Sequence, residues 1–496
     1  MTGNKHGFDR SSGVLLPVSS LPSSYGIGSF GADACRWVDF LHEAGQSYWQ
    51  ILPLSPTGYG DSPYQSFSAF AGNPYFIDLE ILYQDGLLDK ADYRDIRWSH
   101  SDRWVDYGRL YKEREPVLLK AFSRFKDDAA LSAFIRDNHW FEDYSLYMVI
   151  KAAQGQRSWM QWDEPLRKRQ PEALMRIKEE HSEDIRYHGF IQYQFDRQWS
   201  ALRAYANAKG VQVIGDIPIY VSLDSADVWA NTGLFQLGED DLPIEVSGCP
   251  PDSFAKDGQL WGNPLYDWDA MAEADYEWWT FRLRKSFGLF DVLRLDHFRG
   301  LESYFAIKYG AKTAEGGKWK PGPGTRFIDI VEQTVPEARI IAEDLGYLTE
   351  EVRKLLEYST YPGMKIVQYA FDDREAGDYI PYKYEENSVV YPGTHDNDTA
   401  KGWSKNAPKS CIRHAMDYTG IRRRRDLPRG LVCLAMQSNS NLAIIPMQDW
   451  LGFGSRARLN TPSTVGGNNW RWRLKRSALS PALAEEMASV TRMYGR

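Results

Sequence analysis

Val292-Leu293-Arg294-Leu295-Asp296 is a short, nearly continuous apolar run that ends in a carboxylate. Runs of this kind are typical of parallel strands that are buried on both faces of a sheet. Seven similar runs, each followed by polar, Gly or Pro residues, occur at 14–18, 49–54, 211–216, 339–343, 364–369, 388–391 and 442–447. The recurrence predicts eight parallel strands.

Amphipathic helical patterns separate several of these runs. Apolar residues within 34–41 follow the i, i+3, i+4, i+7 spacing, and Gly45 stands where such a helix would end. The stretch 195–206 has the same spacing and ends before Gly210. Strands that alternate with helices predict an α/β fold, specifically a (β/α)8 TIM barrel. An open doubly wound sheet gives the same local pattern and stays an alternative.

The spacing between the runs is uneven along the chain. About 150 residues lie between the second and third runs and about 70 between the third and fourth, whereas a strand-to-helix connection needs only a few residues. We therefore expect one catalytic barrel unit, residues 1–496, with insertion subdomains after strands 2 and 3. The first insertion, 56–195, is mostly helical by pattern, and the second, 222–270, is rich in loops.

The overall charge argues against several classes of partner. The formal net charge is -8 and the pI is about 5.7, so we expect neither nucleic acid nor a membrane surface as a partner. The one cationic run, Arg422–Arg425, is either a solvated helix face or an anion site. Hydrophobic residues make up 43% and charged residues 25% of the chain, which is the balance of a globular protein with a sizeable core.

Cysteine usage and the first residues indicate the cellular compartment. Four scattered cysteines include no C-x-x-C pair, as is typical of a large chain in a reducing compartment. Residues 1–13 lack the apolar core of a signal peptide. No run of about 18 apolar residues is present to span a bilayer. We therefore expect a cytoplasmic protein.

Three carboxylates fall at the predicted C-terminal ends of strands, where the catalytic groups of a barrel lie. Asp296 ends the fourth run, Glu343 ends the fifth, and Asp396 follows the seventh. Such a triad suits glycosidic chemistry, with one carboxylate as nucleophile, one as proton donor and one that supports the positive sugar ring. Glu343 would need burial, and therefore a raised pKa, to hold its proton near neutral pH.

Arg294 lies two residues before Asp296, so both side chains point to the same face of the strand. A guanidinium beside Asp296 favours the ionised carboxylate that a nucleophile needs. A buried structural Arg–Asp pair would give the same spacing, and the residues alone leave both interpretations open.

Two aromatic segments stand where a sugar would bind. Aromatic residues make up 14% of the chain, including 18 Trp and 29 Tyr. Tyr59 begins the stretch 59–64 directly after the second predicted strand, and Trp261 begins the stretch 261–264 in the second insertion. Aromatic rings stack on sugars but also build cores, so position argues for ligand contact more than the count does.

Three other patterns are weaker. The stretch 26–31 matches G-x-G-x-x-G, but a loop separates it from the first strand and the expected acidic residue is missing, so we expect no nucleotide cofactor. His395, Asp396 and Asp398 have no partner segment that would complete a metal site, and we expect no metal. The Gly-rich stretch 316–324 lacks the G-K-[ST] ending of a P-loop and indicates a mobile surface loop or a lid.

A series of motifs is spread in order over nearly the whole chain, at 56–65, 215–221, 250–252, 258–264, 294–300, 342–346, 393–396, 448–449 and 459–462. Together they resemble glycoside hydrolase family 77, the amylomaltases or 4-α-glucanotransferases. That family cleaves an α-1,4 bond, keeps the glucosyl part covalently attached, and passes it to another sugar hydroxyl. The resemblance therefore implies a retaining transglycosylase that acts on maltooligosaccharides and on starch or glycogen chains.

The resemblance also implies roles for individual residues. Asp296 would be the nucleophile, Glu343 the acid/base and Asp396 the transition-state stabiliser. The expected substrate-binding residues are Tyr59, Asp216, Trp261, Asn263, Arg294, His297, His395 and Asn460. Within this set, Arg294 and the two histidines would hold the sugar at the bond being broken. Asp216 and Tyr59 would line the donor side, and the loop 250–264 would guide the acceptor chain.

The sequence departs from the family pattern at three positions that bear on acceptor binding and product size. Ser253 stands where the family often has an aromatic residue, Cys249 precedes the Pro pair, and Ser463 replaces a usual Gly.

Two rival functions use the same residues. An amylase-like hydrolase would need the same triad, because water and a sugar hydroxyl compete for a covalent glycosyl-enzyme, and minor hydrolysis fits the transferase as well. A non-catalytic glucan-binding barrel is permitted by the fold alone, although a binding module has no use for an acid/base pair.

Overall fold

Eight parallel strands close into a barrel in this structure, a computed structural model that describes residues 6–251, 257–346, 348–372, 377 and 379–496. Their order is β1-β12-β11-β10-β9-β6-β3-β2. The strands are β1 (Ser11–Leu15), β2 (Tyr48–Gln50), β3 (Gln212–Ile217), β6 (Val292–Leu295), β9 (Ile340–Ala342), β10 (Gly363–Ile366), β11 (Ser388–Tyr391) and β12 (Leu442–Pro446). The predicted (β/α)8 barrel is confirmed, and the open sheet is wrong because β1 pairs with both β2 and β12.

The first two strands begin earlier than the apolar runs that predict them. β1 includes the buried Ser11 and Ser12, and the Ser12 hydroxyl donates to the Gln46 side chain at 3.1 Å. Leu52 and Leu54 follow the end of β2, yet they are only 3% and 4% exposed. Buried polar residues in strands and buried apolar residues in loops therefore shift the boundaries that hydrophobicity alone predicts.

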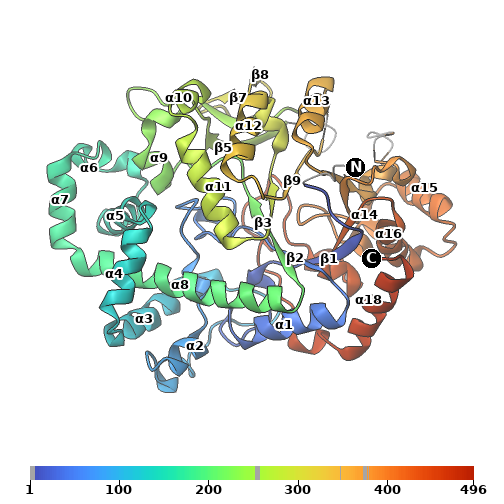
Figure 1. Cartoon of the computed structure of the whole chain (residues 1–496), viewed down its shortest axis with the longest axis horizontal. Helices are drawn as coiled ribbons and strands as arrows, with labels where there is room; N and C mark the ends of the chain where they lie inside the picture. The colour runs from blue at the N-terminus through green and yellow to red at the C-terminus, as the bar shows by residue number, and fades with distance from the viewer. Residues whose placement is uncertain (1–5, 252–256, 347, 373–376, 378) are drawn as a thin grey trace.

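Amphipathic helices cover the outside of the barrel (Figure 1). α1 (Ala32–Glu43) ends before Gly45, as its pattern predicts, and α8 (Ser182–Ala208) leads into β3. The other helices that lie between strands or follow β12 are α11 (Glu277–Leu289), α12 (Gly324–Thr334), α13 (Glu350–Ser359), α14 (Ala400–Asn406), α15 (Lys409–Thr419), α16 (Leu427–Gln437), α17 (Met447–Trp450) and α18 (Pro481–Met493). Within the described ranges, no helix has the length and apolarity needed to cross a membrane.

A group of helices between β2 and β3 lies to one side of the barrel (Figure 1). Its members are α2 (Leu79–Gln84), α3 (Tyr107–Arg124), α4 (Asp128–Asp137), α5 (Trp140–Ala153), α6 (Glu164–Arg167) and α7 (Pro171–Glu180). α5 packs against α8 and also against α9 (Ala226–Ala230), which follows β3. The group therefore contacts both the helix that precedes β3 in the chain and the helix that follows it.

A second, antiparallel sheet has the order β5-β4-β7-β8. β4 (Glu245–Cys249) and β5 (Gln259–Pro264), followed by α10 (Trp268–Glu273), lie in the stretch that the sequence predicts to be rich in loops. β8 (Lys318–Pro321) pairs with β7 (Ser303–Lys308), so the interpretation of the Gly-rich stretch as a mobile loop or a lid is wrong. Phe305 and Trp319 pack edge to face across this pair, with ring centroids 5.2 Å apart, and this contact fixes the short strand in place.

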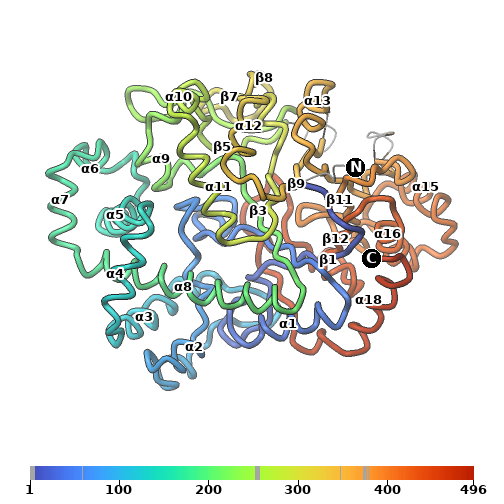
Figure 2. The backbone as a smooth tube through the Cα atoms, viewed as in Figure 1, coloured from blue at the N-terminus to red at the C-terminus, as the bar shows by residue number. Residues whose placement is uncertain are grey.

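The seam of the barrel joins the first and last strands. β1 pairs with β12 along its whole length, from Ser11 opposite Leu442 to Leu15 opposite Pro446. Arg496 reinforces the seam, because its Nη1 donates to the Ser11 carbonyl at 2.9 Å and to the Asn441 carbonyl at 3.0 Å. Figure 2 shows the marked C-terminus close to the labels of β1 and β12.

Gly215 in β3 provides a test of the contact between the barrel and its helices. A Cβ at Gly215 would lie 2.2–2.6 Å from the Phe290 ring, which is itself only 5% exposed. We expect Gly215→Ala to lower the free energy of unfolding by about 1–3 kcal/mol through overpacking. Gly288→Ala in α11 is the matched control, because a Cβ there meets nothing within 4 Å. Thermal melts that rank the two variants equally would contradict this reading of the contact.

Candidate active site

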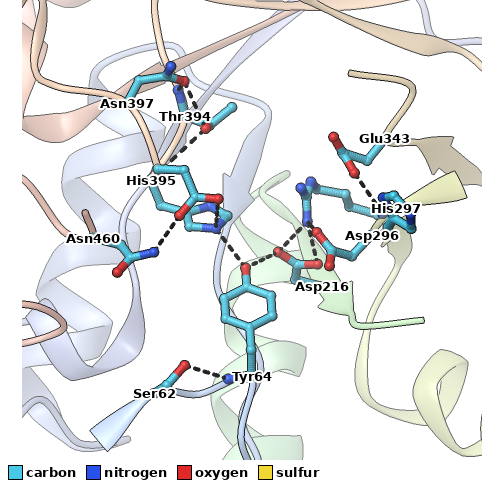
Figure 3. A network of polar contacts seen from close by, with 12 residues as sticks. Ser62, Tyr64, Asp216, Asp296, His297, Glu343, Thr394, His395, Asn397 and Asn460 are labelled. Carbon is cyan, nitrogen blue, oxygen red and sulfur yellow. Dashed lines mark hydrogen bonds and ion pairs between the residues drawn. The ribbon is translucent and has the colours of Figure 1, made fainter. Parts of the chain in front are cut away.

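Three neighbouring strands carry polar side chains to the C-terminal end of the barrel. Asp216 on β3 is the register partner of Arg294 on β6. Asp296 follows β6 and Glu343 follows β9, and the last residues of these two strands are also register partners. Adjacent strands lie about 4.8 Å apart. Asp296 and Glu343 follow neighbouring strands, and Figure 3 shows both on the same side of the site.

A buried arginine contacts two of the carboxylates. Arg294 Nη1 lies 2.7 and 2.8 Å from the two Asp216 carboxylate oxygens and 2.8 Å from Asp296 Oδ1. Burial lowers the pKa of the Arg294 guanidinium, but Asp216 and Asp296 outweigh it and raise that pKa well above its usual value. The contact of Arg294 with Asp296 is common to both interpretations of the spacing, and the buried pair with Asp216 is an addition that the spacing did not predict.

Glu343 has a different environment. Its Oε2 accepts a hydrogen bond of 2.6 Å from the main-chain N–H of His297, a residue with a left-handed backbone (φ 53°). Although the residue is partly accessible, burial raises the pKa of the Glu343 carboxyl to about 8, against the opposing effect of Arg294 and with a further increase from Asp296. A carboxyl with a pKa of about 8 is mostly protonated at neutral pH.

Asp396 comes from the other side of the site, on the loop that follows β11. Its Oδ1 accepts a hydrogen bond of 2.6 Å from Asn460 Nδ2, and its Oδ2 lies 3.5 Å from His395 Nε2. Arg458 binds the main chain here, donating to the Asp396 carbonyl at 2.5 Å and to the Asn460 carbonyl at 2.6 Å. The segment after β12 therefore orients Asp396, which is 44% exposed as a side chain.

Tyr64 links the two halves of the site, and the sequence analysis did not select it. Its hydroxyl donates to Asp216 Oδ2 at 2.7 Å and lies 2.9 Å from His395 Nε2, while its ring stacks on His395 (Figure 3). The sequence signal was the aromatic stretch 59–64, from which Tyr59 was chosen. Tyr59 lies in the short turn η2 (Tyr59–Asp61), and its side chain is outside the described residues.

His297 and Trp261 meet beside Glu343. Their rings are 4.8 Å apart and nearly perpendicular, which brings the β4–β5 hairpin to the barrel rim. Burial lowers the pKa of the His297 imidazole to about 4, so the ring is neutral at physiological pH. The His297 Nε2 atom is buried and has no hydrogen-bond partner among the described residues.

The remaining predicted residues of the second insertion have local roles in the structure or cannot be placed. Asn263 is 6% exposed, and its side-chain nitrogen donates to the Val221 carbonyl at 2.8 Å. Cys249 ends β4 and is half-buried. Ser253 lies outside the described residues.

Ser463 has a left-handed backbone (φ 61°), the conformation that favours the Gly usual at this position of the family. Among the residues that the structure describes, there is no group of three or more His, Cys, Asp or Glu side chains able to hold a metal ion.

Comparisons with known proteins identify the family of this chain. A family model described as 4-alpha-glucanotransferase, that of glycoside hydrolase family 77, matches residues 16–479. The chain belongs to family 77. A family 77 relative from Clostridium butyricum, a 4-alpha-glucanotransferase, is 46% identical over 486 residues, which cover 97% of this chain and 100% of that protein. Another from Thermus thermophilus is 44% identical over 499 residues, with coverage of 97% and 99%.

Solved structures of family 77 proteins are also similar. The amylomaltase from Streptococcus agalactiae in complex with acarbose superposes with a TM-score of 0.95 at 40% identity, covering 98% of this chain and 99% of that one. The amylomaltase from Corynebacterium glutamicum, at 18% identity and a TM-score of 0.76, shares the fold. The family resemblance inferred from the ordered motifs is therefore confirmed.

The raised pKa of Glu343 makes stability depend on pH. The folded-state pKa of about 8 lies above the value of 4.5 for an unperturbed glutamate. The protonated carboxyl therefore contributes stability that is complete below about pH 4.5 and is lost as the pH rises through about 8. We expect Glu343→Gln, which stays neutral, to melt several degrees above the wild type at pH 9 and almost with it at pH 5.

Glu350→Gln at the start of α13 is the control, because that side chain is 68% exposed. Thermal melts from pH 5 to pH 9 in which Glu343→Gln and Glu350→Gln behave alike would contradict the burial of a neutral Glu343.

Proposed function

We propose that this family 77 protein is a retaining transglycosylase that moves α-1,4-glucan segments from a donor maltooligosaccharide, starch or glycogen chain to the 4-OH of an acceptor. The observation that carries the proposal is the contrast between two adjacent carboxylates. Asp296 contacts a guanidinium at 2.8 Å, whereas burial holds the Glu343 pKa at about 8. An ionised nucleophile beside a protonated acid is what a double displacement at an anomeric carbon requires.

In the first step, an Asp296 carboxylate oxygen attacks C1 of the donor sugar. The bond from C1 to the glycosidic oxygen breaks as Glu343 transfers its proton to that oxygen, and the leaving chain departs with a free 4-OH. The product is a glucosyl ester on Asp296. Glu343 is now a carboxylate in a partly desolvated position, which makes it a suitable base.

In the second step, the acceptor 4-OH attacks C1 from the side that the leaving chain vacated. Glu343 takes the proton of that hydroxyl, the bond from C1 to Asp296 breaks, and the configuration at C1 is retained. Asp396, held by Asn460, supports the positive charge on the ring in both transition states. Water competes with the acceptor for the same ester, so minor hydrolysis accompanies transfer.

The surrounding elements would divide the work between donor and acceptor. We assign the donor side to Asp216 and to the rim that follows β2, with 56–195 as a helical insertion subdomain. The acceptor side belongs to the insertion 222–270, whose Trp261 contacts His297. The relatives from Clostridium and Thermus are named as 4-alpha-glucanotransferases, which supports transfer as the activity of this chain. The proposal includes a cytoplasmic location and no cofactor.

Maltotriose is the substrate that tests transfer against hydrolysis. We expect glucose and longer maltodextrins to accumulate with little net gain of reducing ends, because each cleavage is matched by a new α-1,4 bond. Asp296→Asn should lower turnover about a thousandfold or more, since it removes the attacking carboxylate. Product chromatography with a reducing-end assay measures both. A rise in reducing ends equal to the bonds cleaved would replace the transferase by a hydrolase.

The covalent intermediate is tested separately with Glu343→Gln and α-maltosyl fluoride. Fluoride leaves without protonation, so the first step proceeds, while the second slows because no base activates the acceptor. We expect mass spectrometry of the digested protein to show a maltosyl adduct on the peptide that contains Asp296. The double variant with Asp296→Asn is the control and should carry no adduct. An adduct on another residue would refute the assignment of the nucleophile.

A further inference from the structure

One buried carboxylate near the site takes no part in the proposed chemistry. Asp227, at the start of α9, is only 4% exposed. It lines a cavity of about 50 Å³ that is also lined by Tyr64, Asp216 and Arg282. This volume exceeds the roughly 10–15 Å³ that a cavity needs to hold one water molecule. Asp227 therefore lies behind the donor side of the site and shares a cavity with two of its residues.

The Asp227 carboxylate binds the main chain of the segment 66–72. Its Oδ2 accepts a hydrogen bond of 2.8 Å from the Ala69 N–H. The neighbouring Ala226 N–H donates to the Phe67 carbonyl, also at 2.8 Å. Gln192 holds the far end of the segment through two hydrogen bonds with the main chain of Gly72, at 2.7 and 3.0 Å. The start of α9 is thus hydrogen-bonded to the main chain of the segment at Phe67 and at Ala69.

The segment 66–72 continues directly from the hairpin that carries Tyr64. Thr57 and Ser66 form an antiparallel bridge, and the Gly58 N–H donates to the Gln65 carbonyl at 2.9 Å. Tyr64 lies inside this hairpin, next to its closing end. A shift of the main chain at Ala69 would therefore be transmitted to the Tyr64 hydroxyl over five residues of ordered chain.

Burial disfavours the charge of Asp227, but two neighbouring groups partly offset this effect. Burial raises the pKa of the Asp227 carboxyl to about 6, while the Ala69 N–H and the positive charge of Arg282 oppose the rise. The Arg282 side chain is also buried, and its Nε has no hydrogen-bond partner among the described residues. Both charged groups face the shared cavity, where water would solvate them. A charged acceptor binds a main-chain N–H more strongly than a neutral one does.

The geometry points to Asp227 as a positioning residue for Tyr64, which acts through the segment 66–72 to set the contact of the Tyr64 hydroxyl with Asp216 and His395. The inference rests on the proposed transferase function, because its effect is read from transfer between sugars. It adds to that function a residue that touches neither substrate nor reacting atoms.

A double-mutant cycle on maltotriose disproportionation tests the inference. We expect Asp227→Ala to lower kcat about tenfold or more, since a misplacement of about 1 Å is sufficient for such a loss. Asp227→Asn keeps an oxygen acceptor for Ala69 and should stay within about threefold of the wild type. In the Tyr64→Phe background, Asp227→Ala should lower kcat by less than about twofold, because the group it positions is already gone.

Asp291→Ala is the matched control for a merely structural effect. Asp291 Oδ2 also accepts a main-chain N–H, that of Val213 at 2.7 Å, but at the opposite end of the barrel strands. We expect a lower melting temperature with kcat within about twofold of the wild type. If Asp227→Ala does not fold, Asp227→Ser serves in its place, because its hydroxyl is too short to reach Ala69.

Two outcomes would overturn the inference while the wild type still transfers glucose. One is an unchanged kcat in Asp227→Ala. The other is a double variant whose fold-loss of kcat equals the product of the losses in Asp227→Ala and Tyr64→Phe. A wild-type protein that does not disproportionate maltotriose would instead refute the proposed function, so the two failures are distinguishable.

Discussion

The contact of one guanidinium with two carboxylates is the constraint on which the rest of the site depends. Arg294 is 4% exposed as a side chain, and Asp216 is fully buried. Uncompensated charges at such positions would cost several kcal/mol each. Arg294 binds Asp216 on β3 and Asp296 after β6. These ion pairs therefore hold the C-terminal ends of the two strands in register. Tyr64 and His395 then continue the contacts to the opposite wall of the barrel.

Environment, more than residue type, separates the acids of the site. Asp296 and Glu343 leave adjacent strands, yet Asp296 meets a cation while Glu343 meets a main-chain N–H in a desolvated position. For Glu343, burial outweighs the opposing effects of Arg294 and of that N–H and raises the pKa to about 8. Asp396 is held differently again, by the Asn460 amide, and remains the most accessible of the three.

The barrel and the carboxylates that follow β6 and β9 can be predicted from the sequence because each depends on a pattern of neighbouring residues. Apolar runs predict buried strands, and catalytic groups of barrels lie where strands end. β8 was missed because Lys318–Pro321 is too short to show alternation and is flanked by glycines. Tyr64 was missed because two tyrosines, Tyr59 and Tyr64, follow the same strand, and no local feature of the sequence distinguishes them. Arg458 could not be found, since its contacts with the Asp396 and Asn460 carbonyls arise from tertiary proximity alone.

The seam between β1 and β12 has a consequence for synthesis on the ribosome. Until residues 442–446 emerge, β1 and β11 each lack a neighbour, and the nascent sheet exposes two unpaired edges. Such edges are templates for association between chains. Arg458 and Asn460 emerge later still, so Asp396 cannot acquire its orientation before the residues that close the cylinder have been made. Slow codons or a chaperone acting near that stage would therefore influence yield more than the same intervention earlier in the chain.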